Sequence, residues 1–168
     1  MWRRRAWLAA LLCAPGLAGA AVDSLLDPAA AKPSSKLSVV STRALAFGTF
    51  VAGAGGTITI APSGARTRTG GVIVMGSSPS SSAAFQVSES KTGIVTNVVI
   101  LTLPANGGVT LQSGTNSMTL SGFTSDKPLV STLVGNSLSV SVGATLTVRA
   151  NQPRGKYTGS IPLTVEYQ

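Results

Sequence analysis

The chain has 168 residues, a formal net charge of +8, no histidine and one cysteine. Without histidine a Ser/His/Asp triad is impossible, and metal sites lose their usual nitrogen and sulfur ligands. Aromatic residues make up only 5% of the chain, which argues against a sugar-binding platform built from stacked rings.

Residues 1–20 show the three parts of a secretory signal peptide. Three arginines at 3–5 form a positive n-region, residues 6–12 form an apolar h-region, and residues 18–20 form a small-residue cleavage site. A membrane anchor is disfavoured because a spanning helix needs about 20 apolar residues. We therefore expect a secreted chain that has no transmembrane helix and no thiol, since Cys13 is removed with the signal peptide.

The net charge falls to +5 after this cleavage, because ten basic and five acidic residues remain. Nucleic-acid-binding proteins usually concentrate such a charge on one face. Here the basic residues are scattered along the chain: Lys32, Lys36, Arg43, Arg66, Arg68, Lys91, Lys127, Arg149, Arg154 and Lys156. We interpret the excess as favouring solubility and attraction to anionic cell surfaces, and we expect no nucleic-acid partner.

Residues 21–36 are expected to form a flexible N-terminal lead, because they combine two prolines, small residues and mixed charge. From residue 37 onward, short runs rich in Val, Ile, Leu and Thr alternate with Gly, Ser, Asn and Pro clusters. These runs predict strands over 37–42, 44–51, 56–61, 71–76, 83–89, 96–103, 108–113, 117–123, 129–134, 137–142, 145–150 and 157–167. No sustained helical period occurs after residue 20, so the pattern predicts a single all-β domain over 37–168, a sandwich or a barrel.

The last predicted strand, 157–167, has the clearest period-two pattern. Its odd positions are apolar or aromatic and its even positions are polar, so one face of the strand is apolar. The apolar face consists of Tyr157, Gly159, Ile161, Leu163, Val165 and Tyr167. Pro162 cannot donate to a sheet ladder, so one side of the strand must lack a partner there or be bulged. An apolar strand with an incomplete neighbour at this place in the chain needs something to cover it.

Motifs for catalysis are weak. Ser88 to Lys91 fits S-x-x-K, and residues 91–93 fit K-T-G, two patterns of β-lactamase-type enzymes. In those enzymes the two patterns are separate elements, whereas here one lysine serves both, so a solvated hairpin end is the better interpretation. Of the five acidic residues, Asp23 and Asp27 lie in the N-terminal lead and the other three are far apart in sequence, so a glycosidase pair is not expected. The glycine-rich run 53–56 lacks the Lys-Ser/Thr of a phosphate loop. We expect no enzyme activity, no cofactor and no metal.

An ordered set of short motifs carries a family resemblance across residues 37–168. The motifs are LAFG (45–48), TITIAPSGARTRTGGV (57–72), AAFQVS (83–88), LTLPA (101–105) and VGATLTVRANQPRGKYTGSIPLTVEY (142–167). In this order they resemble the bacterial secreted family catalogued as domain of unknown function 4402. That family is in turn similar to subunits of chaperone–usher pili, including the spore-coat-like pilins, through an early L-x-F-G and a final G-x-Y-x-G strand with a penultimate tyrosine, here Tyr167.

The resemblance implies an immunoglobulin-like β-sandwich of the pilin type. In pilins the last strand borders a groove left by a missing seventh strand, so the resemblance implies that the apolar face of 157–167 is the site of subunit interaction. A periplasmic chaperone fills the groove first, and the N-terminal extension of the next subunit then replaces it by strand addition. The implied protein is a non-enzymatic structural or adhesive subunit of a fimbria in a Gram-negative bacterium. It would pass from the periplasm to the cell surface, with a chaperone, an outer-membrane usher and like subunits as partners.

The sequence leaves two questions open: whether the protein polymerises, and which residues would act as the donor strand. The protein could instead be a self-contained secreted β-sandwich binding module that does not polymerise. A donor segment should also alternate apolar residues, which residues 21–36 do poorly, and Leu37 and Val39 fit equally well in the domain's own first strand. Many pilins also carry a disulfide, which this chain lacks.

Secretion gives the first testable prediction. When the full chain is expressed in a Gram-negative host, the signal pattern of residues 1–20 predicts that the mature protein begins at Ala21. N-terminal sequencing of protein released from the periplasm checks this. Recovery of a mature chain that still begins at Met1 or Trp2 would contradict the prediction.

Overall fold

The computed structural model describes residues 36–90 and 96–168, and within them every regular element is a β-strand. The all-β prediction is therefore confirmed, while the predicted signal peptide and Lys91 lie outside the described residues. The strands are β1 Lys36–Arg43, β2 Phe50–Val51, β3 Gly56–Ile60, β4 Arg66–Gly70, β5 Ile73–Val74, β6 Ala83–Ser90, β7 Asn97–Thr102, β8 Val109–Ser113, β9 Asn116–Ser125, β10 Val130–Leu133, β11 Ser137–Val148 and β12 Thr164–Tyr167.

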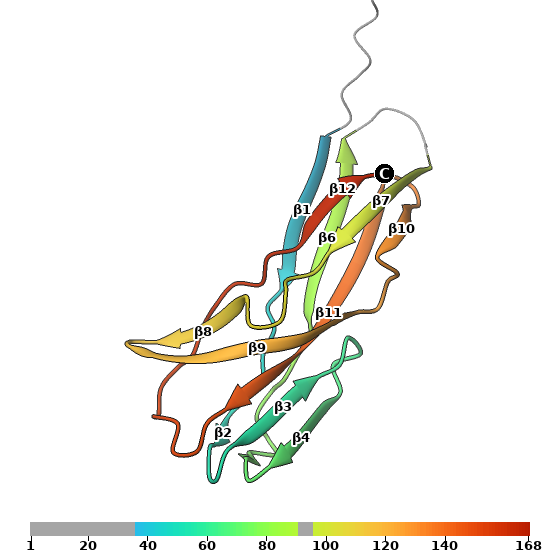
Figure 1. The fold of residues 1–168 in the computed structure, drawn as a ribbon. Helices are drawn as coiled ribbons and strands as arrows, with labels where there is room; N and C mark the ends of the chain where they lie inside the picture. The colour runs from blue at the N-terminus through green and yellow to red at the C-terminus, as the bar shows by residue number, and fades with distance from the viewer. Residues whose placement is uncertain (1–35, 91–95) are drawn as a thin grey trace, which may run out of the picture. The chain divides into compact units, whose positions relative to one another are not determined.

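The longest strand, β11, organises a seven-stranded antiparallel sheet (Figure 1). Its first half pairs with β6, its second half with β3, and the stretch from Val142 to Leu146 with β9. Strands β1, β4 and β8 then pair with β6, β3 and β9 respectively. The sequence of β11 suits this position because its even residues are apolar and buried from Val140 to Val148, while its odd residues are mainly Ser and Thr.

A three-stranded sheet, in the order β10-β7-β12, packs against part of the larger sheet. Inward-facing Val99, Leu101 and Leu133 of the small sheet share one hydrophobic cluster with residues of β6 and β11. A second cluster joins β3, β8, β9 and the end of β11, and it includes Phe47, which lies outside the strands. Full burial of each large apolar side chain in these clusters is worth about 1.5–3 kcal/mol.

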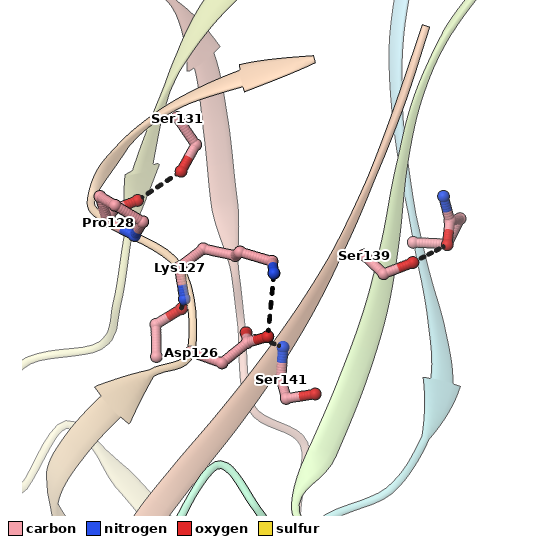
Figure 2. Close-up of polar contacts among 8 residues, drawn as sticks. Asp126, Lys127, Pro128, Ser131, Ser139 and Ser141 are labelled. Atoms are coloured by element: carbon pink, nitrogen blue, oxygen red, sulfur yellow. Dashed lines mark hydrogen bonds and ion pairs between the residues drawn. The ribbon is translucent and has the colours of Figure 1, made fainter. Parts of the chain in front are cut away.

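The connection from β9 to β10 carries the chain between the two sheets, and Asp126 fixes its start (Figure 2). The Asp126 carboxylate accepts a hydrogen bond from the backbone N–H of Ser141 on β11 at 2.6 Å, and it lies 3.4 Å from the Lys127 ammonium. The Ser131 hydroxyl donates to the carbonyl of Pro128 at 2.6 Å, which closes the turn before β10. These bonds hold the loop against β11.

The predicted strand boundaries differ from the observed ones at several positions. The sequence contains no apolar alternation over β4, so that strand was not predicted; it lies at the edge of its sheet, where both faces can be polar. The predicted strands 137–142 and 145–150 are one continuous strand, β11. The predicted strand 44–51 is regular only at β2, with an isolated bridge from Ala46 to Ser81.

Gly143 explains why β11 stays continuous where the sequence predicts a break. Its pairing with β9 shifts register between Gly143 and Thr145. A Cβ atom at residue 143 would lie 2.2 Å from the carbonyl oxygen of Ile60 and 2.8 Å from the nitrogen of Pro62. Only glycine allows the turn after β3 to approach β11 this closely.

The second prediction follows from this contact. Gly143→Ala should lower the free energy of unfolding by about 1–3 kcal/mol, because the added methyl group meets backbone atoms that cannot move aside. Gly76→Ala is the matched control, since nothing lies within 4 Å of its added Cβ. Urea denaturation of both variants measures the difference. Equal stability of the two variants would contradict the close approach.

Candidate functional site

The predicted site residues lie along the C-terminal segment, and their burial follows the predicted alternation in part. Even positions from 158 to 168 are exposed, whereas Tyr157, Ile161, Leu163 and Val165 are half-buried. Gly159 and Tyr167 are exposed, and Tyr167 retains 38% of its accessible surface. Ile161 packs against both hydrophobic clusters, and Leu163 and Val165 pack against the cluster between the sheets. The apolar face thus points to the core without being fully covered.

The C-terminal segment is hydrogen-bonded along one side only. Thr158 exchanges two backbone hydrogen bonds with Gln112 of β8, at 2.8 and 3.0 Å, and β12 pairs with β7. The predicted strand 157–167 is therefore interrupted: Pro162 lies between the bridge at Thr158 and the start of β12, where no ladder forms. Within the described residues, no strand pairs with the other edge of β12.

The strand that faces this free edge is β1 (Figure 1). Within the described residues β1 pairs with β6 alone, so its second edge is free there as well. Val39 lies opposite Val87, a fully buried residue, and so points to the core side, yet it keeps 36% of its surface exposed. We call these two facing edges, of β1 and β12, the open seam. The seam leaves core-facing side chains of both edge strands in partial contact with solvent.

A groove of about 1270 Å³ lies beside the first part of the C-terminal segment. Residues 44–53 form one wall and residues 151–159 form the other. Leu111, Met118 and Leu146 also line it; Met118 and Leu146 belong to the buried core, so they form its floor. Because each wall continues into one of the two edge strands, the groove lies in line with the open seam along the chain.

Arg66 on β4 fastens the 44–53 wall from outside. Its guanidinium donates to the carbonyls of Phe47, Met75 and Ser78 at 3.2–3.3 Å. The N–H of Thr49 also donates to the Ser78 hydroxyl. These bonds hold the wall to the loop after β5, so it does not collapse into the groove. In the sequence Arg66 is one of two arginines in the run 57–72, and its bonds to carbonyls 9 to 19 residues away could not be predicted from that pattern.

The opposite wall is held by Tyr157. Its hydroxyl donates to the carbonyl of Pro153 at 2.8 Å and accepts from the side-chain amide of Gln152 at 3.0 Å. The same amide donates to the carbonyl of Ser117 on β9 at 3.2 Å. This network fixes the turn 151–157 against the larger sheet. Tyr157 is therefore a structural part of the groove wall, in addition to its place on the predicted apolar face.

The charged side chains that line the groove are basic. Among the residues that the structure describes, Arg154 and Lys156 are the only charged ones that line it, and both are exposed. Neither side chain makes a hydrogen bond or an ion pair within the part of the chain that the structure describes. The groove is therefore apolar at its floor and basic at one rim.

The residues considered for chemistry do not converge at this groove. Ser88 lies on β6, and its neighbour Glu89 is buried and accepts a hydrogen bond from the Asn97 amide at 2.6 Å. Asp126 is engaged with β11, and Glu166 lies on the exposed face of β12. Across residues 36–90 and 96–168, no cluster of three or more metal-ligating side chains occurs. In the same residues, no helix is long and apolar enough to cross a membrane.

The fold and the site together define an all-β domain whose C-terminal segment forms one wall of an apolar groove and then continues into the edge strand β12. Residues 37–167 match the family described as Domain of unknown function (DUF4402), and the chain belongs to that family. No curated protein and no solved structure matches the chain with significance.

The third prediction concerns Gly159, whose missing side chain lets the C-terminal segment approach β8. An added Cβ would lie 2.7 Å from the carbonyl oxygen of Thr110 and 2.9 Å from Leu111. Gly159→Val should therefore lower the free energy of unfolding by more than about 1 kcal/mol, the usual centre of mutational effects. Ser160→Val, at the exposed neighbouring position, should change it by less than about 0.5 kcal/mol. Equal losses in thermal denaturation would count against the close approach.

Proposed function

We propose that this protein is a non-enzymatic, secreted structural or adhesive subunit that assembles into a surface fibre by β-strand addition. The observation that carries the proposal is the open seam between β1 and β12, with the apolar groove in line with it. An added strand gains main-chain hydrogen bonds from a free sheet edge and affinity from side chains inserted in apolar pockets. Both features occur here along one line of the domain.

The same proposal includes the finer class of the fold. An immunoglobulin-like sandwich of the pilin type, with one strand missing, accounts for two adjacent free edges that enclose half-buried apolar residues. It also implies partners outside this chain: a periplasmic chaperone, an outer-membrane usher and like subunits. The protein would be exported to the periplasm and displayed on the cell surface of a Gram-negative bacterium.

The structure narrows which part of this chain can act as a donor. β1 is hydrogen-bonded to β6 from Lys36 to Arg43, so Leu37 and Val39 belong to the domain's own sheet. A donor supplied by this chain must therefore come from the residues before β1. The segment available after signal cleavage is 21–35.

The fourth prediction tests strand addition directly. Residues 36–168 alone should melt at a low temperature or aggregate, since a free apolar edge invites pairing. A peptide of residues 21–35, at about 100 times its Kd, would add about 2.7 kcal/mol, which corresponds to a rise in Tm on the order of 10 °C. A peptide of the same composition in scrambled order is the control.

One outcome would defeat the proposal. If residues 36–168 are monomeric, stable and unmoved by the 21–35 peptide, the chain is a self-contained binding module that does not polymerise. Calorimetry gives the melting temperature, and light scattering coupled to gel filtration gives the mass.

A further inference from the structure

The groove rim has a charge preference that identifies its occupant. We infer that the groove takes residues 22–27 of a second copy of this chain, and that Arg154 and Lys156 select this segment through its two carboxylates. The inference rests on the proposed function and makes it more specific. It names the donor, the contacts that distinguish it from other apolar strands, and the resulting dependence on salt.

The groove provides the first part of the evidence. Its floor is apolar, and its only charged lining residues are Arg154 and Lys156, which have no ion-pair partner within the described residues. The C-terminal wall on which they stand is exposed from residue 153 to 156. An apolar groove beside two free cations favours a strand with apolar side chains on one face and acidic side chains on the other.

The sequence of the N-terminal lead provides the complementary pattern. In VDSLLD (22–27), Val22, Ser24 and Leu26 lie at even positions, and Asp23, Leu25 and Asp27 lie at odd positions, so one face carries two apolar side chains and the other carries both carboxylates with one leucine between them. If the segment is extended, side chains at alternate positions point to opposite faces, so Val22 and Leu26 can enter the groove while both carboxylates point outward. No basic residue occurs between residues 21 and 31, so this stretch carries two negative charges.

The length of chain favours a second copy over the chain's own lead. β1 has eight residues, so about 26 Å separates its start from residue 44, where the groove begins. The nine residue steps from Asp27 to Lys36 span at most about 32 Å when fully extended. The difference, about 6 Å, is less than two residues, whereas reversing the chain direction takes at least two turn residues.

The test measures assembly of the secreted protein, residues 21–168, at matched concentration by light scattering. A competing peptide of residues 21–31 should dissolve the assemblies, and the peptide with Asp23→Asn and Asp27→Asn should need about ten times the concentration, because two exposed ion pairs together correspond to roughly a tenfold change in affinity. Arg154→Gln with Lys156→Gln should weaken assembly by a similar factor. Raising the salt concentration should weaken wild-type assembly and narrow these differences.

Further variants make the result specific. Lys36→Gln with Arg149→Gln removes the same charge from exposed side chains that do not line the groove, and it should leave assembly unchanged. Arg154→Glu with Lys156→Glu should abolish assembly with wild-type donors, and Asp23→Lys with Asp27→Lys on the donor should restore it. Charge reversal without rescue, or equal potency of the two peptides, would overturn the charge selection while wild-type assembly still supports strand addition. If the wild-type protein does not assemble at all, and neither peptide binds, both proposals fail together.

Discussion

A β-strand presents its backbone polar groups alternately to its two edges, and β12 has a partner at only one of them. The N–H of Gln168 donates to the carbonyl of Val98 at 3.0 Å, so residue 168 bonds toward β7. Alternation then directs the backbone groups of Glu166 and Thr164 to β7 as well, and those of Val165 and Tyr167 to the free edge. The half-buried Val165 side chain also faces the core. The same residues therefore offer both unpaired hydrogen-bonding groups and apolar surface.

This double exposure links the architecture to the proposed function. An edge strand that is both unpaired and apolar is a site of uncontrolled association unless something covers it. Charged side chains or prolines often protect such edges, but Pro162 lies before β12, and Glu166 points away from the core. The fixed walls of the groove, held by Arg66 and Tyr157, keep the site open and preformed. A preformed groove lowers the entropy cost of accepting one strand.

The sequence predicted most of the strands and the apolar face of the C-terminal segment, because both depend on local period-two alternation. It did not predict β4, because Arg66 to Thr69 have no apolar alternation and the bonds of Arg66 are made to partners outside the strand. It also predicted a continuous strand from 157 to 167, whereas partners exist only at Thr158 and from Thr164 onward. No local pattern in the sequence predicts the groove, because its two walls, residues 44–53 and 151–159, are separated by about one hundred residues.

Amide hydrogen exchange at the C-terminal strand tests the open seam most directly. In the isolated subunit, the amides of Val165 and Tyr167 should exchange rapidly, while the amide of Glu166, bonded toward β7, should be protected. In the assembled fibre all three should be protected, because the added strand pairs with the free edge. Protection of Val165 and Tyr167 in the isolated subunit, or no change on assembly, would contradict an open seam that a second copy fills.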